Sequence, residues 1–217
     1  MRSMKEIFYS YGVLDPQGRH VNGTDKETNH HYGDAYEGLF AQHDINLCTY
    51  PSGWQSRYCN LCGSDTSHFV TCPHYKLTRD GVHLMLEVGV ADGSSLCAWR
   101  EIFPNALCVG LDIHHSDKAH GERIEFHLGD ATSQHDCERA AGGRQFDLIV
   151  DDAMHHIMCV LPTLLFLWPY IRPGGLYVVE EFEGINSLRP NVTSLFPFSE
   201  IVETTGPSGG CEPLVVF

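Results

Sequence analysis

The chain has 217 residues, of which 42% are hydrophobic, and this is enough to bury the core of about one domain. Its 14 Lys and Arg against 28 Asp and Glu give a formal net charge of -14, which argues against a nucleic-acid partner because phosphate backbones are bound by basic side chains. No stretch reaches the roughly 18 apolar residues of a membrane span, and the N-terminus lacks a signal-peptide core. We expect a folded cytoplasmic protein with no membrane partner.

Residues 1–83 are rich in His, Tyr, Gly, Cys and turn formers and show little periodicity, so we expect an N-terminal cap or lid with an irregular insertion at about 44–82. The chain has nine cysteines, an odd number that favours thiols or metal ligands over a disulfide framework. Within the insertion, Cys59 and Cys62 are followed by Cys72 and His74. This set can close a tetrahedral zinc site, although its second pair is tighter than usual; thiols in a variable loop are the alternative.

From residue 84 onward, short apolar runs alternate with segments of helical length. The predicted strands lie at 84–90, 106–113, 146–152 and 176–181, with a further strand in the run IEFHLGDA at 124–131, and the predicted helices lie at 94–103, 132–145 and 156–171. The segment 172–175, RPGG, is expected to be a turn, and 199–217 two strands that close an edge of the sheet. This alternation predicts that residues 84–217 form a doubly wound, Rossmann-like α/β domain with a mostly parallel sheet.

An acidic residue stands at or just after the end of each of the first three predicted strands. In LEVGVADGSS, Glu87 precedes a turn framed by Gly89 and Gly93; Asp112 ends the next strand, and Asp130 follows the third. Glycines allow a ligand to approach the backbone, a helix N-terminus presents free N–H groups, and Asp112 is placed to bind ribose hydroxyls. The candidate cofactor residues of this region are Glu87, Gly89, Gly93, Ser95, Asp112 and Asp130.

The glycine pattern distinguishes between nucleotide cofactors. A dinucleotide site has G-x-G-x-x-G, whereas this chain has an acid two residues before Gly89 and the next glycine at 93. A carboxylate at Glu87 suits the amino group of a methionine moiety better than a pyrophosphate, and the chain lacks the P-loop lysine of an ATP site. These features favour S-adenosylmethionine.

The motifs LEVGVADGSSL, VGLDI, GDA, FDLIVDDAMHH and RPGGLYVVEE resemble the class I S-adenosylmethionine-dependent methyltransferases. More narrowly, they resemble the metal-dependent sugar O-methyltransferases that act on macrolide antibiotics, a group that also has a segment similar to residues 23–40. The resemblance covers about 23–40 and 84–183. It implies that 23–40 folds over the cofactor with Thr24 as a contact; the alternative is that Thr24 or Asp25 only caps a helix.

Two acid pairs form the predicted catalytic centre. Asp151 and Asp152 end one predicted strand, and Glu180 and Glu181 end the next, so four carboxylates meet if these strands are neighbours. A hard divalent cation, Mg2+, would relieve their repulsion. The resemblance implies that Asp152, Glu180 and Glu181 bind the metal and that His155 is the general base, although the group tends to have Glu-Asp at 180–181.

The alternative is a structural role, in which the acids after residue 150 only cap the following helix. Asp151 either caps this helix or contacts the cofactor. His156 is expected to be structural or a solvent-facing neighbour of the base.

The sequence thus predicts a Mg2+-dependent O-methyltransferase that acts on a hydroxyl of a sugar or glycosylated small molecule. A nicotinamide-dependent oxidoreductase and a non-catalytic protein that binds a partner through its cysteine-rich insertion are the rival hypotheses. The acceptor and the oligomeric state stay open, a homo-oligomer included.

Overall fold

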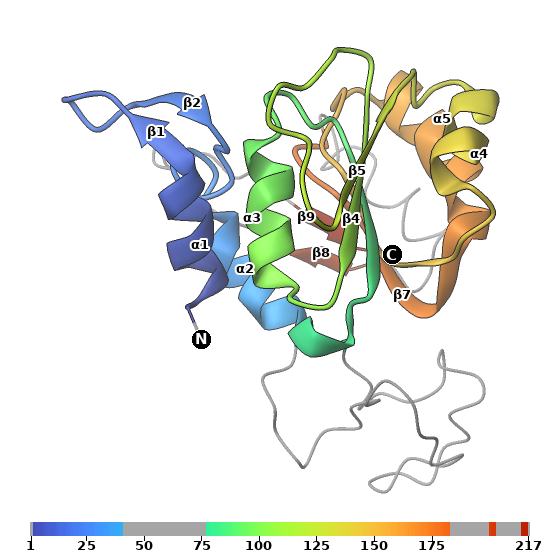
Figure 1. Cartoon of the computed structure of the whole chain (residues 1–217), viewed down its shortest axis with the longest axis horizontal. Coiled ribbons are helices and arrows are strands. Elements are labelled where there is room, and N and C mark those ends of the chain that lie inside the picture. The colour runs from blue at the N-terminus through green and yellow to red at the C-terminus, as the bar shows by residue number, and fades with distance from the viewer. Residues whose placement is uncertain (1, 41–76, 183–199, 203–213, 217) are drawn as a thin grey trace, which may run out of the picture.

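A seven-stranded sheet is the centre of the described chain, which comprises residues 2–40, 77–182, 200–202 and 214–216 of the computed structural model (Figure 1). The strand order is β5-β4-β3-β6-β7-β9-β8. The first five strands of this order are parallel to one another. They are β3 (Leu84–Val88), β4 (Leu107–Asp112), β5 (Ile124–Leu128), β6 (Phe146–Asp151) and β7 (Ile171–Val179). The chain extends from β3 to one side and then returns to add β6 and β7 on the other, which confirms the predicted doubly wound fold.

The last two strands complete one edge of the sheet. β9 (Leu214–Val216) pairs antiparallel with β7, and β8 (Glu200–Val202) pairs antiparallel with β9. All three side chains of β9 are buried. The prediction that the C-terminal residues close the sheet edge is therefore confirmed.

Helices cover both faces of the sheet (Figure 1). On one face lie α1 (Met4–Tyr11), α2 (Tyr32–Leu39) and α3 (Ser94–Ile102), and on the other lie α4 (Gln134–Ala141) and α5 (Ile157–Leu167). Trp99 of α3 is fully buried and packs edge-on against Phe8 and Tyr36, with ring centroids 4.8 and 4.9 Å away. These aromatic contacts attach the N-terminal helices to the sheet domain, because burial of large rings is a major source of packing energy.

Three further parts of the chain complete the described fold. β1 (Gly12–Leu14) and β2 (His20–Gly23) form a hairpin between α1 and α2. The short 3-10 helices Arg79–Gly81 and Trp168–Tyr170 precede β3 and β7. Most of the predicted insertion lies outside the described residues, as do Cys59, Cys62, Cys72 and His74, so the zinc site stays a prediction.

The segment RPGG differs from its predicted role as a turn. It lies inside β7, where the pairing with β6 jumps from Phe146–Ile171 to Leu148–Leu176. Gly174 has φ of +80°, a conformation that glycine adopts without steric cost. The extra residues form an irregularity in the strand, since glycine lets the chain bend without leaving the sheet.

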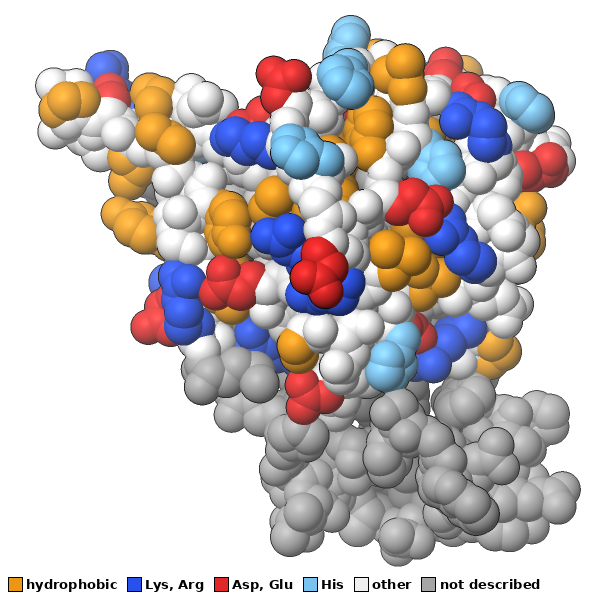
Figure 2. Space-filling model, viewed as in Figure 1, with side chains coloured by type: hydrophobic (Ala, Val, Ile, Leu, Met, Phe, Trp, Pro, Cys, Tyr) orange, Lys and Arg blue, Asp and Glu red, His pale blue; other side chains and the backbone are white. Residues whose placement is uncertain are grey.

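Acidic and basic side chains are interspersed on the face drawn in Figure 2. Arg144 donates two hydrogen bonds to the carboxylate of Glu125, at 2.8 and 2.9 Å, and so adds a bidentate pair to the edge strand β5.

Among the described helices, none is long and apolar enough to cross a membrane.

We expect the Glu125–Arg144 pair to make the free energy of unfolding depend on pH in the acidic range. The hydrogen bonds from Arg144 lower the pKa of Glu125 to about 2. Because the folded-state pKa is depressed, the stabilisation is present above the unfolded pKa of about 4.5 and is lost as the pH falls towards 2. Glu125→Gln should cost about 0.5–1 kcal/mol at neutral pH, given the partial exposure of the pair, and less at about pH 3. Urea unfolding at both pH values, with the exposed Glu122→Gln as control, measures this difference; a pH-independent cost would contradict it.

Candidate active site

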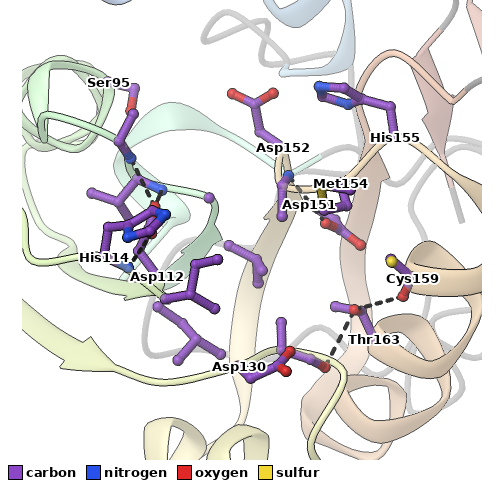
Figure 3. A pocket seen from close by; sticks show the side chains of 18 of the residues that line it. Ser95, Asp112, His114, Asp130, Asp151, Asp152, Met154, His155, Cys159 and Thr163 are labelled. Carbon is purple, nitrogen blue, oxygen red and sulfur yellow. Dashed lines mark hydrogen bonds between the residues drawn. The ribbon is translucent and has the colours of Figure 1, made fainter.

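A cavity of about 680 Å³ opens at the carboxyl ends of β3, β4 and β6 (Figure 3). It lies where the chain reverses its direction of winding, which is the edge at which open α/β sheets bind ligands. Its volume is within the roughly 300–1,000 Å³ of small-molecule and cofactor sites. Asp112 lies on one side of the cavity, and Asp152 and His155 lie on the other (Figure 3).

The turn after β3 approaches the loop after β6 closely. Gly89 lines the cavity with φ of +82°, and a Cβ atom at this position would lie 2.2 Å from the carbonyl oxygen of Asp152. Gly93 has φ of +89° and precedes the first turn of α3, outside the cavity lining. Both glycines thus have a structural reason to be there, and Gly89 in addition lets the two loops meet beside the cavity.

Asp112 organises the same turn. One oxygen of its carboxylate accepts hydrogen bonds from the N–H groups of Val90 and Ala91, at 2.7 and 2.9 Å, and the other accepts one from His114 at 2.7 Å. The carboxylate lines the cavity while it holds the turn. Contact with a ribose, as predicted from the sequence, requires it to share these acceptor sites with the ligand.

Glu87 does not line the cavity, because its side chain is buried between β3 and α3. It accepts hydrogen bonds from the Ser95 hydroxyl at 2.8 Å and the Trp99 indole at 2.9 Å, and Lys26 Nζ lies 3.5 Å away. Burial raises the pKa of Glu87 to about 7. The cation beside this carboxylate is therefore Lys26, where the sequence suggested the amino group of a ligand. Ser95 reaches the cavity wall.

The remaining candidate cofactor residues line the cavity. Asp130 is exposed and accepts a hydrogen bond from the N–H of Thr132 at 2.8 Å. Asp151 is buried, which raises its pKa to about 7, and Tyr177 donates to it at 3.4 Å. Thr24 is buried in the wall that the N-terminal segment contributes. Since α2 begins only at Tyr32, the alternative that Thr24 or Asp25 caps a helix is wrong.

The two acid pairs meet at one edge of the sheet, because β6 and β7 are neighbours and the Glu180 N–H donates to the Asp151 carbonyl at 2.9 Å. A cation not foreseen from the sequence joins them: Lys26 Nζ donates to Asp152 Oδ2 at 2.8 Å and to Glu180 Oε2 at 2.7 Å. Burial alone would lower the pKa of Lys26, but the surrounding carboxylates raise it well above its usual value. The Tyr36 hydroxyl also donates to Glu180.

Glu181 points instead to two histidines. His30 Nδ1 lies 2.6 Å from one of its oxygens, and His155 Nε2 lies 3.0 Å from the other. The remaining nitrogen of His30 contacts Asp25 at 3.1 Å, and that of His155 lies 3.3 Å from the Glu180 carbonyl. The hydrogen bond with Glu181 is the main cause that raises the pKa of His155 to about 9. His30 belongs to the N-terminal segment and was not among the predicted site residues.

A loop, and not a helix, holds His155. α5 begins at Ile157, and its cap is His156, whose ring accepts a hydrogen bond from the Met158 N–H at 3.2 Å. The alternative that the acids after residue 150 cap this helix is therefore wrong, and His156 has the structural role expected for it. The spacing of Asp152 and His155 does not correspond to one helical turn, because the residues between them are not helical.

The three predicted metal ligands do not converge on one point. Asp152 and Glu181 line the cavity, whereas Glu180 faces Lys26 and Tyr36. Among the described residues, no three His, Cys, Asp or Glu side chains are grouped so as to hold a metal ion. The arrangement of the described side chains does not fit Mg2+, because a lysine ammonium lies between two of the proposed ligands and two imidazoles engage the third.

A family model described as a methyltransferase domain matches residues 86–182, the part of the chain that carries this cavity. Over residues 86–182 the chain is thus similar to a class I methyltransferase domain. The fold of the domain agrees with that of a putative ribosomal RNA methyltransferase from Plasmodium falciparum, with a TM-score of 0.50 at 19% identity over 62% of this chain and 84% of that chain.

The methyltransferase domain is similar in sequence to curated sugar O-methyltransferases. Demethylmacrocin O-methyltransferase of Streptomyces fradiae is 34% identical over 50% of this chain and 29% of its own length. Mycinamicin VI 2''-O-methyltransferase of Micromonospora griseorubida is 35% identical over the same shares. A structure of MycE methyltransferase with Mg, SAH and mycinamycin VI matches 50% of this chain and 30% of that chain, with 32% identity and a TM-score of 0.45. The chain therefore spans less than a third of the length of the curated relatives it matches.

Proposed function

We propose that this chain transfers the methyl group of S-adenosylmethionine to a hydroxyl group of a sugar or of a glycosylated small molecule. The observation that carries the proposal is the cavity of the methyltransferase domain, which has Asp112 on one side and the imidazole of His155 on the other. The similarity to curated O-methyltransferases, whose names include demethylmacrocin and mycinamicin VI, supports a glycosylated acceptor.

The chain's own residues suit proton removal from a hydroxyl group. His155 has two contacts: Nε2 lies 3.0 Å from Glu181, and Nδ1 lies 3.3 Å from the Glu180 carbonyl. The contact at Nδ1 is the longer one, so an acceptor hydroxyl can replace the Glu180 carbonyl there more easily than it can replace Glu181 at Nε2. In the neutral form of the ring, which becomes more populated as the pH rises towards the His155 pKa of about 9, Nδ1 carries no proton and takes that of the hydroxyl group, while Glu181 holds Nε2–H and stabilises the imidazolium that forms. The acceptor oxygen bonds to the methyl carbon, the carbon–sulfur bond breaks, and S-adenosylhomocysteine leaves.

The other contribution of the domain is to align the two reactants. Such positioning can supply a large part of the rate enhancement of a bimolecular reaction. The resemblance implies Mg2+, but the proposed transfer has no step that uses it. Lys26 already joins Asp152 and Glu180, and the two histidines hold Glu181.

Calorimetric titration with S-adenosylmethionine and with NAD tests the proposal against the oxidoreductase hypothesis. Methyl transfer from labelled S-adenosylmethionine to a panel of glycosylated acceptors and their aglycones then tests the reaction. Labelling of the glycosylated compounds alone is expected. Binding of NAD without S-adenosylmethionine would contradict the proposal, and cofactor binding without labelling of any hydroxyl compound would favour the non-catalytic alternative.

Asp112→Ala is expected to weaken S-adenosylmethionine binding by about 10- to 100-fold, which corresponds to about 1.4–2.8 kcal/mol. The change removes a carboxylate from the cavity wall and releases the Val90 and Ala91 N–H groups that shape the turn. Asp117→Ala, at an exposed position outside the cavity lining, is the matched control. Equal affinities in the two variants would show that Asp112 does not serve the cofactor.

A further inference from the structure

The N-terminal segment brings a fully buried positive charge to the acid cluster, which we define as Glu87, Asp152, Glu180 and Glu181. Lys26 has no exposed surface, and its Nζ lies 2.7 Å from Glu180, 2.8 Å from Asp152 and 3.5 Å from Glu87. Glu180 and Glu87 are also buried, with 1% and 0% of their surfaces exposed. Three carboxylates from the ends of three different strands thus share one ammonium group.

A cation at this point lowers the electrostatic cost of the acid cluster. Carboxylates that are close together in a buried site repel one another, and each charge removed from water costs several kcal/mol unless it is paired and hydrogen-bonded. Lys26 has three N–H donors, and the positions of Glu180, Asp152 and Glu87 surround them. The ammonium group therefore relieves the repulsion between the carboxylates, which is the role that the sequence analysis gave to Mg2+.

The fourth carboxylate of the cluster is engaged by the same N-terminal segment. His30 contacts Glu181 at 2.6 Å and Asp25 at 3.1 Å, and His155 contacts the other oxygen of Glu181 at 3.0 Å. Glu181 is held in a left-handed conformation with φ of +51°, which a non-glycine residue adopts only when its surroundings enforce it. Both oxygens of Glu181 are thus directed at imidazoles and away from Lys26.

We infer that Lys26 is the resident cation of the acid cluster and that its ammonium takes the place a divalent metal would need. Two consequences follow from the geometry. A metal ion that used both Asp152 and Glu180 would have to displace Nζ from them, so Mg2+ binds weakly. The ammonium also anchors residues 24–32 to the ends of β3, β6 and β7, which keeps Thr24 in the cavity wall. This inference concerns the charge balance of the site and does not depend on the identity of the acceptor.

Mg2+ titration of the wild-type chain, followed by calorimetry with and without S-adenosylhomocysteine, is the first test. No saturable heat is expected up to about 1 mM Mg2+, and the melting temperature should not change with Mg2+. A dissociation constant in the micromolar range would overturn the inference, whether or not any variant folds. Failure of S-adenosylhomocysteine itself to bind would count against the proposed methyl transfer alone, since the Mg2+ result without cofactor still decides the role of Lys26.

Lys26→Met is the second test, because it keeps the length of the side chain and removes the charge. Breaking a buried ion pair should lower the melting temperature by about 10 °C, and Mg2+ should restore part of this loss and bind at least tenfold more tightly than to wild type. Lys5→Met, at a half-exposed lysine that pairs with Asp34, is the control and should shift the melting temperature by less than about 2 °C with no response to Mg2+. An unchanged melting temperature in Lys26→Met, or a loss that Mg2+ does not reduce at all, would overturn the inference.

Discussion

Gly89→Ala is expected to destabilise the methyltransferase domain by about 3 kcal/mol. A left-handed backbone costs roughly 1–2 kcal/mol for a residue with a Cβ atom, and Gly89 has φ of +82°. The Cβ atom would also lie 2.2 Å from the Asp152 carbonyl oxygen and 2.6 Å from Ala153 Cα. Backbone atoms cannot rotate away as a side chain can, so the loop after β6 must shift, and such overpacking adds about 1–3 kcal/mol.

Gly143→Ala separates the two contributions. Gly143 has φ of +71°, and a Cβ atom there would meet nothing within 4 Å. Its loss of stability should therefore be about 1–2 kcal/mol, from backbone strain alone. Urea unfolding of both variants measures the difference, and equal losses would show that the loops after β3 and β6 are not in the close contact described. Because the displaced carbonyl belongs to Asp152, which lines the cavity, Gly89→Ala should also lower methyl transfer.

His155→Gln is expected to lower kcat for methyl transfer by about 10²–10⁴-fold, the usual contribution of a general base. Glutamine keeps a hydrogen-bonding side chain towards Glu181 but cannot take the proton of the acceptor hydroxyl. Binding of S-adenosylmethionine should change little, because no predicted cofactor contact is removed. Single-turnover rates, measured together with cofactor titration, separate the two effects.

His156→Gln is the matched control for this experiment. His156 is the adjacent residue, it is exposed, and its ring caps α5 by accepting from the Met158 N–H, which a glutamine oxygen can also do. The rate should stay within about twofold of wild type and the stability within about 1 kcal/mol. A similar fall in rate for both variants, or a loss of cofactor affinity in His155→Gln, would contradict the role of His155 as the base.

The architecture of the domain was predictable because its determinants are local or periodic. Short apolar runs separated by helical segments identify buried parallel strands, and the carboxyl ends of such strands lie at one edge of the sheet. Asp112, Asp130 and Asp151 could therefore be placed around one cavity before any contact was known, and the structure puts all three in its lining. The acids at 151–152 and 180–181 meet for the same reason, since their strands are neighbours.

Sequence alone determined which residues reach this edge of the sheet, whereas the tertiary structure decided what each side chain touches there. Glu87 turns into the core, His155 is held by a loop, and Lys26 joins Asp152 to Glu180. Along the chain, Lys26 is 126 residues away from Asp152 and 154 residues away from Glu180. A contact of this kind leaves no periodic trace in the sequence, because it arises only when separate strands and the N-terminal segment pack together and a buried charge must find its partners.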